Sequence, residues 1–406
     1  MSAIMLRLRE YARLTNTLGA WGLLVSFWGV FLVAFSEHMA PRFTYLAGRP
    51  IGDDLPCHKP ECDFSTFWPA GMLARTHDYI TVYAAHSFVG EVNRLLPPSP
   101  NVETFFYPPT MLPLVAAISH LPFETGAFLW MFVPLFLAAV LLRNTGLSWS
   151  VIVAGLLSPA ALFSTQIAQL GVLGGALLVA GLCALEQRPF AAGGMLGLMA
   201  AKPQIGILVP FVLLRRRRAL VAFAATALAL VVLAVLQFGL EPWRAYLTYG
   251  RTEMTHKMGE NFDPHGWLGW GISVYWLLRS LGVGVIGAMA VQAAIALICV
   301  TVLLWLQPKC RGADFTEIAV YLSLLATPYG NTYDMVAYSL VLAEAARRRS
   351  WRIGMLDTVL WLWPGFCLVV SIATGVLLTP VFVLAALLRA ALRARAAVLP
   401  PRPTGA

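Results

Sequence analysis

Charge is scarce in this sequence: Asp, Glu, Lys and Arg make up 12% of its 406 residues, whereas 59% are hydrophobic. Soluble domains carry about 25% charged residues, so the composition excludes an ordinary cytosolic enzyme. The abundance of Leu, Val, Phe and Trp also excludes a disordered chain. A net charge of +9 is typical of nucleic-acid-binding proteins, but membrane proteins collect arginine in their cytoplasmic loops. The composition therefore indicates an all-α polytopic membrane protein that does not bind nucleic acid.

Cysteine and several familiar catalytic signatures are also scarce or missing. Six cysteines in 406 residues do not form a disulfide scaffold. The sequence has no Walker A loop, no His-Glu-x-x-His motif and no Gly-x-Ser-x-Gly elbow. ATP-driven transport and these hydrolytic mechanisms therefore have no support. No internal repeat is visible either, although secondary transporters usually show two related halves.

Long apolar stretches fill most of the chain. A membrane span needs about 20 apolar residues, and several of the stretches are shorter than that. We predict about twelve transmembrane helices, at residues 17–37, 107–121, 124–142, 148–165, 170–186, 190–213, 219–238, 284–306, 315–327, 333–346, 355–372 and 376–392. A single integral membrane domain would then cover residues 1–398, followed by a proline-rich, disordered tail at 399–406.

The basic residues predict how these helices are oriented. More than half of the 29 lysines and arginines fall in segments that would share one side of the membrane. Arginine and lysine in short loops favour the cytoplasmic side. We therefore predict that both termini are cytoplasmic.

Two long connections, at about 38–106 and 239–283, would lie on the outer side. Long structureless loops are usually functional or disordered. The first connection is rich in aromatic residues and has apolar residues at helical spacing through 67–75 and 79–92. We expect it to form short helices at the membrane surface.

Asp63 is the candidate general base, because it begins an aromatic segment close to where the first outer loop would meet the bilayer. The residues alone favour the alternative, a helix N-cap, since Asp before a helical pattern is a common start signal. Glu61 and Asp63 together form an acid-x-acid pair that could hold a metal ion, although a solvated loop charge also explains Glu61.

Cys57 and Cys62 flank a short segment that contains His58 on the predicted outer side. An oxidising compartment favours a disulfide between the two cysteines. A metal site with His58 is the alternative, but it lacks a fourth ligand nearby.

Lys202 falls halfway along the apolar stretch 190–213, followed by Pro203 and Gln204. Charged residues inside a membrane are costly and indicate function by default. Pro203 should kink the helix. We interpret Lys202 as an anion-binding residue with a phosphate as its partner, helped by Gln204 and by the hydroxyl of Tyr107. Snorkelling or a structural ion pair is the alternative.

A turn at 327–334 separates two apolar segments on the outer side. Its polar and aromatic residues suit a sugar, but they equally suit anchoring at the membrane interface. The segment from Asp263 to Gly266, which contains His265, reads as a plain turn. The candidate residues for sugar or acceptor binding are Trp68, Tyr329, Asn331, Tyr333, Asp334 and His265.

These motifs together resemble glycosyltransferase family 87, whose members are membrane-embedded C-type glycosyltransferases. They occur in the family's order over most of the chain. The residues that carry the resemblance are Asp63-Phe64, Phe67-Trp68-x-Ala70-Gly71, Phe106-Tyr107-Pro108-Pro109, Ala168-Gln169-Leu170-Gly171, Leu198 to Gln204, Glu241-Pro242-Trp243, Thr327-Pro328-Tyr329 and Tyr333-Asp334. Many relatives read Gly-Gln-Asn-Gly at the fourth motif, so the asparagine amide is missing here.

The resemblance implies an inverting glycosyltransferase that takes a sugar from a polyprenyl-phosphate donor at the outer face, with Asp63 as the matching base. The expected location is a bacterial inner membrane, with the active site facing the periplasm. Mannose is the expected sugar because mannosyl transfer is prominent in the family. The acceptor would be a hydroxyl of a lipid or glycan. We expect no metal or other cofactor, because a single phosphate leaving group lacks the charge of a pyrophosphate. The rival functions are a secondary transporter or flippase of an anionic or polyprenyl-linked substrate, and an inactive assembly partner.

Overall fold

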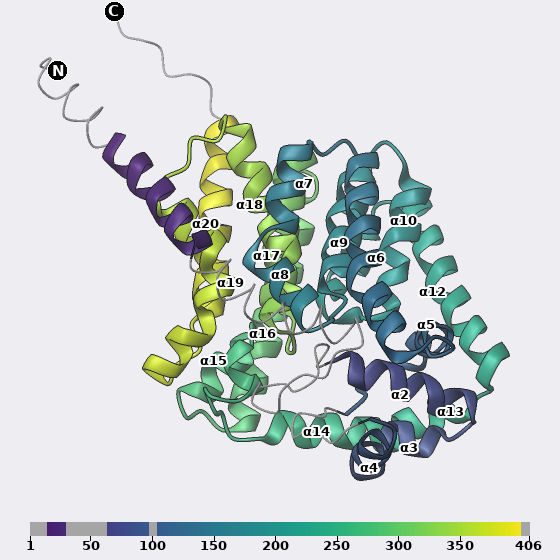
Figure 1. Cartoon of the computed structure of the whole chain (residues 1–406). Helices are drawn as coiled ribbons and strands as arrows, with labels where there is room; N and C mark the ends of the chain where they lie inside the picture. Colours follow the sequence, from purple (N-terminus) through teal and green to yellow (C-terminus); the bar gives the residue numbers. More distant parts are fainter. Residues whose placement is uncertain (1–13, 30–62, 97–103, 399–406) are drawn as a thin grey trace, which may run out of the picture.

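The computed structural model describes residues 14–29, 63–96 and 104–398, and this part of the chain is helical throughout. Its one departure from helices and loops is an isolated antiparallel bridge between Gly271 and Asn331. The predicted all-α class is therefore confirmed for the described residues. The helices form an upright bundle with a layer of shorter helices across one end, drawn at the bottom of Figure 1.

Among the described residues, four helices of the bundle are long and apolar enough to cross a membrane, which indicates a membrane protein. Helices α7 (Trp149–Leu156) and α8 (Pro159–Gln166) bend by 53° at their junction and would together provide a fifth span. The bend falls where Ser158 caps α8 and Pro159 occupies its first turn. The four long helices are α6 (Phe123–Asn144), α12 (Arg217–Phe238), α16 (Val285–Leu306) and α19 (Met355–Thr374).

The described parts of the remaining predicted spans are mainly helical, but most of these helices are too short to cross a membrane on their own, so twelve spans are not confirmed. The stretch 190–213 is divided at Lys202 rather than merely kinked, because Pro203 starts a new turn. The shorter elements are α5 (Leu112–Ile118), α9 (Gly171–Ala184), α10 (Pro189–Gly197), η2 (Leu198–Ala201), η3 (Pro203–Gly206), α11 (Val209–Leu213), α17 (Gly312–Ala326), α18 (Val336–Arg348) and α20 (Thr379–Val398).

The centre of the bundle is formed by α9, α17 and α18. These three helices are buried over most of their length, whereas α12 and α16 keep large apolar side chains on the surface. Such a distribution suits a membrane, because lipid can cover the outer helices while the inner ones pack on protein. The inner helices also carry the loops that form the site described below.

The end layer comes from the two long connections predicted to lie outside. Its core is aromatic: Phe64 and Phe67 both pack on Trp130 of α6. The short helices expected in the first connection are therefore present, and the second connection, for which none were predicted, forms short helices as well. They are α2 (Phe64–Arg75), α3 (Tyr79–Tyr83), α4 (Ala85–Leu95), α13 (Glu241–Ala245), the π-helix η4 (Tyr246–Gly250), α14 (Arg251–Gly259), η5 (Trp267–Trp270) and α15 (Val274–Ser280).

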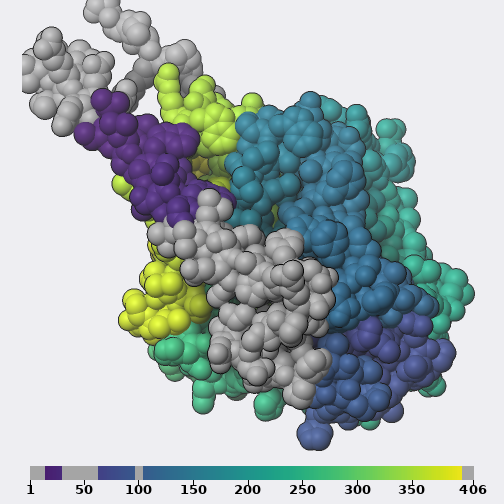
Figure 2. Space-filling model, viewed as in Figure 1, coloured from purple at the N-terminus to yellow at the C-terminus, as the bar shows by residue number. Residues whose placement is uncertain are grey.

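The helix over residues 14–29 lies at the edge of the molecule beside the C-terminal helices (Figure 2). Ala20 packs against Ala346 and Ile353, and Asn16 accepts a hydrogen bond from the backbone N–H of Met355 at 3.1 Å. The first predicted span therefore joins the last third of the chain rather than its neighbours in sequence.

Buried carboxylates tie the last four helices together at the end opposite the short-helix layer. Glu317 of α17 pairs with Arg348 of α18 and Arg393 of α20. Asp357 of α19 pairs with Arg349 and Arg389, at 2.6 and 2.8 Å. Several of the arginines that predicted the orientation therefore also hold this helix group together, while the orientation itself stays a prediction.

Gly171 is required where α9 begins. A Cβ at this position would lie 1.9 Å from the carbonyl oxygen of Tyr333. We expect Gly171→Ala to destabilise the fold by at least about 2 kcal/mol, measured as a lower thermal unfolding temperature in detergent. The control is Gly174→Ala, where the new methyl would meet only the flexible end of Ile205 at 3.1 Å. Equal stability of the two variants would contradict the close-contact argument.

Candidate active site

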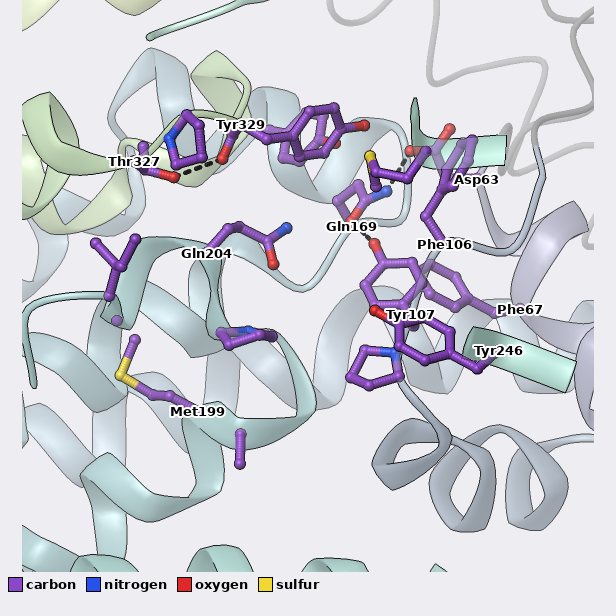
Figure 3. Close-up of a pocket in the computed structure, with 18 of the residues that line it drawn as sticks. Asp63, Phe67, Phe106, Tyr107, Gln169, Met199, Gln204, Tyr246, Thr327 and Tyr329 are labelled. Carbon is purple, nitrogen blue, oxygen red and sulfur yellow. Dashed lines mark hydrogen bonds between the residues drawn. The ribbon is translucent and has the colours of Figure 1, made fainter. Parts of the chain in front are cut away.

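A cavity of about 490 Å³ lies between the short-helix layer and the bundle (Figure 3). One part of its wall is polar and the other is apolar. The polar and aromatic lining residues include Asp63, Thr66, Phe67, Tyr107, Gln169, Gln204, Tyr246, Thr327, Tyr329 and Tyr333. A cavity of this size and mixed lining is typical of a small-molecule or cofactor site.

The carboxylate of Asp63 is held at the polar part of the cavity by Gln169. The Gln169 amide nitrogen donates to Asp63 Oδ2 at 2.5 Å, and its amide oxygen accepts from the Tyr107 hydroxyl at 2.9 Å (Figure 3). The same amide oxygen also accepts from Lys202 Nζ at 3.1 Å. An ammonium group only donates, so the atom that faces Lys202 must be the amide oxygen. The amide nitrogen is thereby directed at Asp63, which accepts as a carboxylate.

Asp63 occupies the N-cap position of α2, but its side chain makes no capping hydrogen bond. Its backbone N–H instead donates to the carbonyl of Ile167 at 3.2 Å, which ties the start of α2 to the loop that carries Gln169. Asp63 therefore lies at the N-cap position, as the alternative predicted, but its carboxylate does not cap the helix.

A strained turn presents Gln169 to the cavity. Ala168 has a positive φ of 57°, in the left-handed region that favours glycine. The turn is held by Trp130, whose indole N–H donates to the Ala168 carbonyl at 3.0 Å, and by Ser164, which accepts from the Gln169 N–H at 2.8 Å. Backbone strain of this kind is often found at functional sites. Leu170, at the position of the asparagine of many relatives, is buried in the aromatic cluster.

Lys202 lies directly behind the cavity wall and forms a buried ion pair. Its Nζ is 2.7 Å from Asp334 Oδ1, and the two side chains are only 7% and 1% exposed. The ammonium also faces the ring of Tyr333 at 4.8 Å. The structural ion pair considered from the sequence is therefore present. Lys202 does not line the cavity itself but contacts three residues that do, Gln169, Tyr107 and Tyr333.

The 327–334 turn brings most of its predicted residues to the site. Tyr329 and Tyr333 line the cavity. Asn331 supports Tyr333 from behind by donating to its hydroxyl at 2.9 Å, and its backbone N–H reaches Asp334 Oδ2 at 3.4 Å. The turn therefore supplies two aromatic walls and the counter-ion of Lys202.

The rest of the cavity wall is apolar and runs along the broken stretch 190–213 towards α12. Pro203, Ile207 and Pro210 lie on one exposed face of η3 and α11, and Phe223 of α12 stands opposite. Leu196 and Met199 form the buried floor. A polar chamber is thus continuous with an apolar groove on a membrane-spanning helix.

Two predicted sugar-binding residues lie elsewhere. Trp68 does not line the cavity, because its indole N–H donates to the carbonyl of Leu121 at 3.0 Å and its ring packs on Phe123. His265 is exposed on a turn closed by Asp263, whose carboxylate accepts from the His265 N–H at 2.9 Å. The plain-turn interpretation is therefore confirmed. Glu61, Cys57 and Cys62 lie outside the described residues.

Gln169 is the residue that sequence reasoning missed as a site residue. Its motif was recognised, but nothing in a single sequence shows that one amide contacts Asp63, Tyr107 and Lys202 at once. These contacts join positions that are 106, 62 and 33 residues apart. Gln169 could have been predicted as a site residue from its place beside a glycine-rich turn between two apolar helices.

We expect Gln169→Leu to lower turnover by about tenfold to a hundredfold, because a loosened Asp63 is misplaced in the reacting geometry. The measurement is the rate of sugar transfer by purified protein, with folding checked by thermal unfolding. Gln166→Leu is the control, since Gln166 does not line the cavity. Turnover of Gln169→Leu within threefold of the unaltered protein would remove the positioning role.

An apolar helical bundle with a half-buried carboxylate in a large cavity is the architecture expected of a membrane enzyme. The profile of glycosyltransferase family 87 matches residues 105–328, which is more than half of the chain. The chain therefore belongs to glycosyltransferase family 87, and this membership favours the enzyme over the transporter. Neither a curated protein nor a solved structure matches it. The matched region contains Tyr107, Gln169 and Lys202 but begins after Asp63.

Proposed function

We propose that this protein is an inverting glycosyltransferase that moves a sugar from a polyprenyl-phosphate donor to a hydroxyl of a lipid or glycan acceptor. The observation that carries the proposal is the Asp63 carboxylate, which lines the cavity and is oriented by Gln169. Family membership supports sugar transfer. The arrangement fits a reaction that needs one base and no acid.

In the proposed step, Asp63 accepts the proton of the acceptor hydroxyl while the oxygen attacks the anomeric carbon. The bond between that carbon and the phosphate oxygen breaks, and the phosphate leaves with the electron pair. Attack from the side opposite the leaving group inverts the anomeric configuration. A phosphate ester leaves as an anion without being protonated, so a single carboxylate is sufficient for proton transfer.

The two parts of the cavity suit the two parts of this donor. The polar part, with Gln204, Tyr329 and Tyr333, would hold the sugar and phosphate. The apolar groove along Ile207 and Pro210 would hold the first isoprene units, because burying apolar surface there removes it from the polar head-group region. No lysine, arginine or histidine of the described residues lines the cavity, so we propose that Lys202 supplies the positive charge from behind the wall.

We further propose that mannose is the sugar and that the site faces the periplasm of a bacterial inner membrane. The supporting observation for sidedness is the separation of the site from the Arg215–Arg218 turn. The cavity opens at the short-helix end of the bundle, whereas Arg215 to Arg218 lie at the start of α12, whose other end reaches that layer. Arginine-rich turns favour the cytoplasm.

The decisive experiment offers purified protein radiolabelled polyprenyl-phosphate mannose, galactose or arabinose with a panel of lipid and glycan acceptors. Formation of a glycosidic product with inverted configuration supports the proposal. Movement of the donor across a vesicle membrane without a product would overturn it. Binding with neither activity would instead identify an inactive assembly partner.

We expect this transfer to continue without a metal ion. A monoester phosphate leaving group does not carry the pyrophosphate charge that usually recruits a divalent cation, and Lys202 can balance part of it. The measurement is turnover in excess EDTA, which should stay within about twofold of the untreated rate. Complete loss, restored by one divalent ion, would refute metal independence and bring Glu61 and Asp63 back as metal ligands.

A further inference from the structure

A second cavity, of about 460 Å³, is lined by a different set of residues from the candidate active site and lies at another set of turns. It is formed by the end of α9, the turn between α11 and α12, and the turn between α16 and α17. The lining residues are Leu185, Glu186, Arg215, Arg216, Gln307, Pro308 and Arg311. Three guanidinium groups therefore meet one carboxylate around a space large enough for a phosphate group.

The arginines of this cavity lack the carboxylate partners found elsewhere at helix ends. No ion pair within 4.0 Å is present for Arg215, Arg216 or Arg311 in the described part of the chain. The arginines of α18 and α20, by contrast, bind Asp314, Glu317, Glu344 and Asp357. Converging positive charges repel one another unless an anion lies between them.

The cavity is built into the fold rather than being only a run of flexible side chains. Gln307 is 6% exposed and donates to the carbonyls of Phe211 and Val212, at 3.1 and 2.7 Å, which joins the end of α16 to α11. Arg216 packs on the ring of Phe315 at 5.1 Å. Burial lowers the pKa of Arg216, the charge of Glu186 raises it, and the charge of Arg311 lowers it.

The position of the cavity favours a lipid as the source of the anion. It adjoins the last residue of α16 and the first of α12, which are two of the helices able to cross a membrane. Leu214 and Trp305, next to the cavity in sequence, are 54% and 60% exposed. Apolar surface beside a basic cavity at a helix end suits the acyl chains and the phosphate of one molecule.

We propose that this cavity binds the phosphate group of an anionic phospholipid through Arg215, Arg216 and Arg311. Arginine suits the role because its planar guanidinium can donate two hydrogen bonds to one phosphate. A bound lipid would fill the space between α9, α11 and α16 and hold these helix ends together. This site is separate from the proposed transfer reaction and does not depend on it.

The test compares two double substitutions in the purified full-length protein. Arg215→Gln/Arg311→Gln removes two charges from the cavity. Arg217→Gln/Arg218→Gln removes two charges from the same basic turn but from residues that do not line it. All four arginines are exposed, so neither change opens the core. Native mass spectrometry from a neutral detergent then measures retained dioleoyl-phosphatidylglycerol against dioleoyl-phosphatidylcholine.

We expect the unaltered protein and the Arg217/Arg218 variant to retain phosphatidylglycerol in preference to phosphatidylcholine. The Arg215/Arg311 variant should bind it at least about tenfold more weakly. Equal loss in both variants would show diffuse attraction to a basic surface and overturn the site. Equal retention of the two lipids would do the same. Arg311→Gln alone, with an expected loss of about threefold or more, serves if the double variant fails to fold.

A parallel arm offers inorganic phosphate and follows thermal unfolding, which separates the two sources of the anion. Protection of the unaltered protein by phosphatidylglycerol but not by millimolar phosphate supports the lipid. Protection by phosphate alone, lost in Arg215→Gln/Arg311→Gln, would overturn the lipid assignment and identify the cavity as a site for a free anion.

Discussion

Asp63→Asn should abolish most sugar transfer, lowering turnover by about 10² to 10⁴. The substitution keeps the size of the side chain and an oxygen that can accept from Gln169, but it removes the basicity needed to take the acceptor proton. The expected loss corresponds to about 3–5 kcal/mol at the transition state. Donor affinity should change little, because no phosphate contact is removed. Both quantities can be measured in nanodiscs with the labelled donor.

Asp78→Asn is the matched control for this result. Asp78 caps α3 and accepts a hydrogen bond from the Thr81 N–H at 3.2 Å, so it makes the capping interaction that Asp63 does not. Asparagine caps helices about as well as aspartate does. We expect the Asp78 variant to keep near-normal turnover. If Asp63→Asn also keeps turnover within threefold, the general-base assignment is wrong.

Lys202→Met should weaken both the fold and donor binding. The buried Asp334 carboxylate, 1% exposed, loses its only ion-pair partner in the described part of the chain. Breaking a buried pair by removing one partner typically costs 3–5 kcal/mol. We therefore expect a fall in the unfolding temperature together with a loss of donor affinity. Thermal unfolding and equilibrium binding of the labelled donor measure the two effects separately.

The double variant Lys202→Met/Asp334→Asn separates structure from binding. It removes both charges, and the asparagine oxygen can still accept from the Asn331 N–H. We expect the unfolding temperature to recover most of its loss, since replacing a whole buried pair is often neutral. Donor affinity should stay low, because the positive charge near the phosphate is still absent. Recovery of donor affinity together with the fold would show that Lys202 has a structural role alone.

The amino-acid sequence indicated the class of protein, the short helices of the first long connection and five of the residues that line the cavity. Composition decided that the chain lies in a membrane, because so much apolar surface needs lipid or protein to cover it. The short helices in the first long connection follow from its local apolar spacing. Tyr107, Gln204, Tyr329 and Tyr333 stood out as polar or aromatic residues in apolar surroundings, and all four line the cavity.

The tertiary structure alone decided which helices are long enough to span and which partners the charges take. Apolar content is the same for a span and for a buried core helix, so α9 and α17 looked like crossings although the bundle buries them as short helices. The pairing of Lys202 with Asp334, 132 positions apart, depends on how the broken stretch 190–213 meets the 327–334 turn. The orientation of Asp63 likewise depends on an amide from another helix pair, because hydrogen-bond geometry is set by packing and not by local sequence.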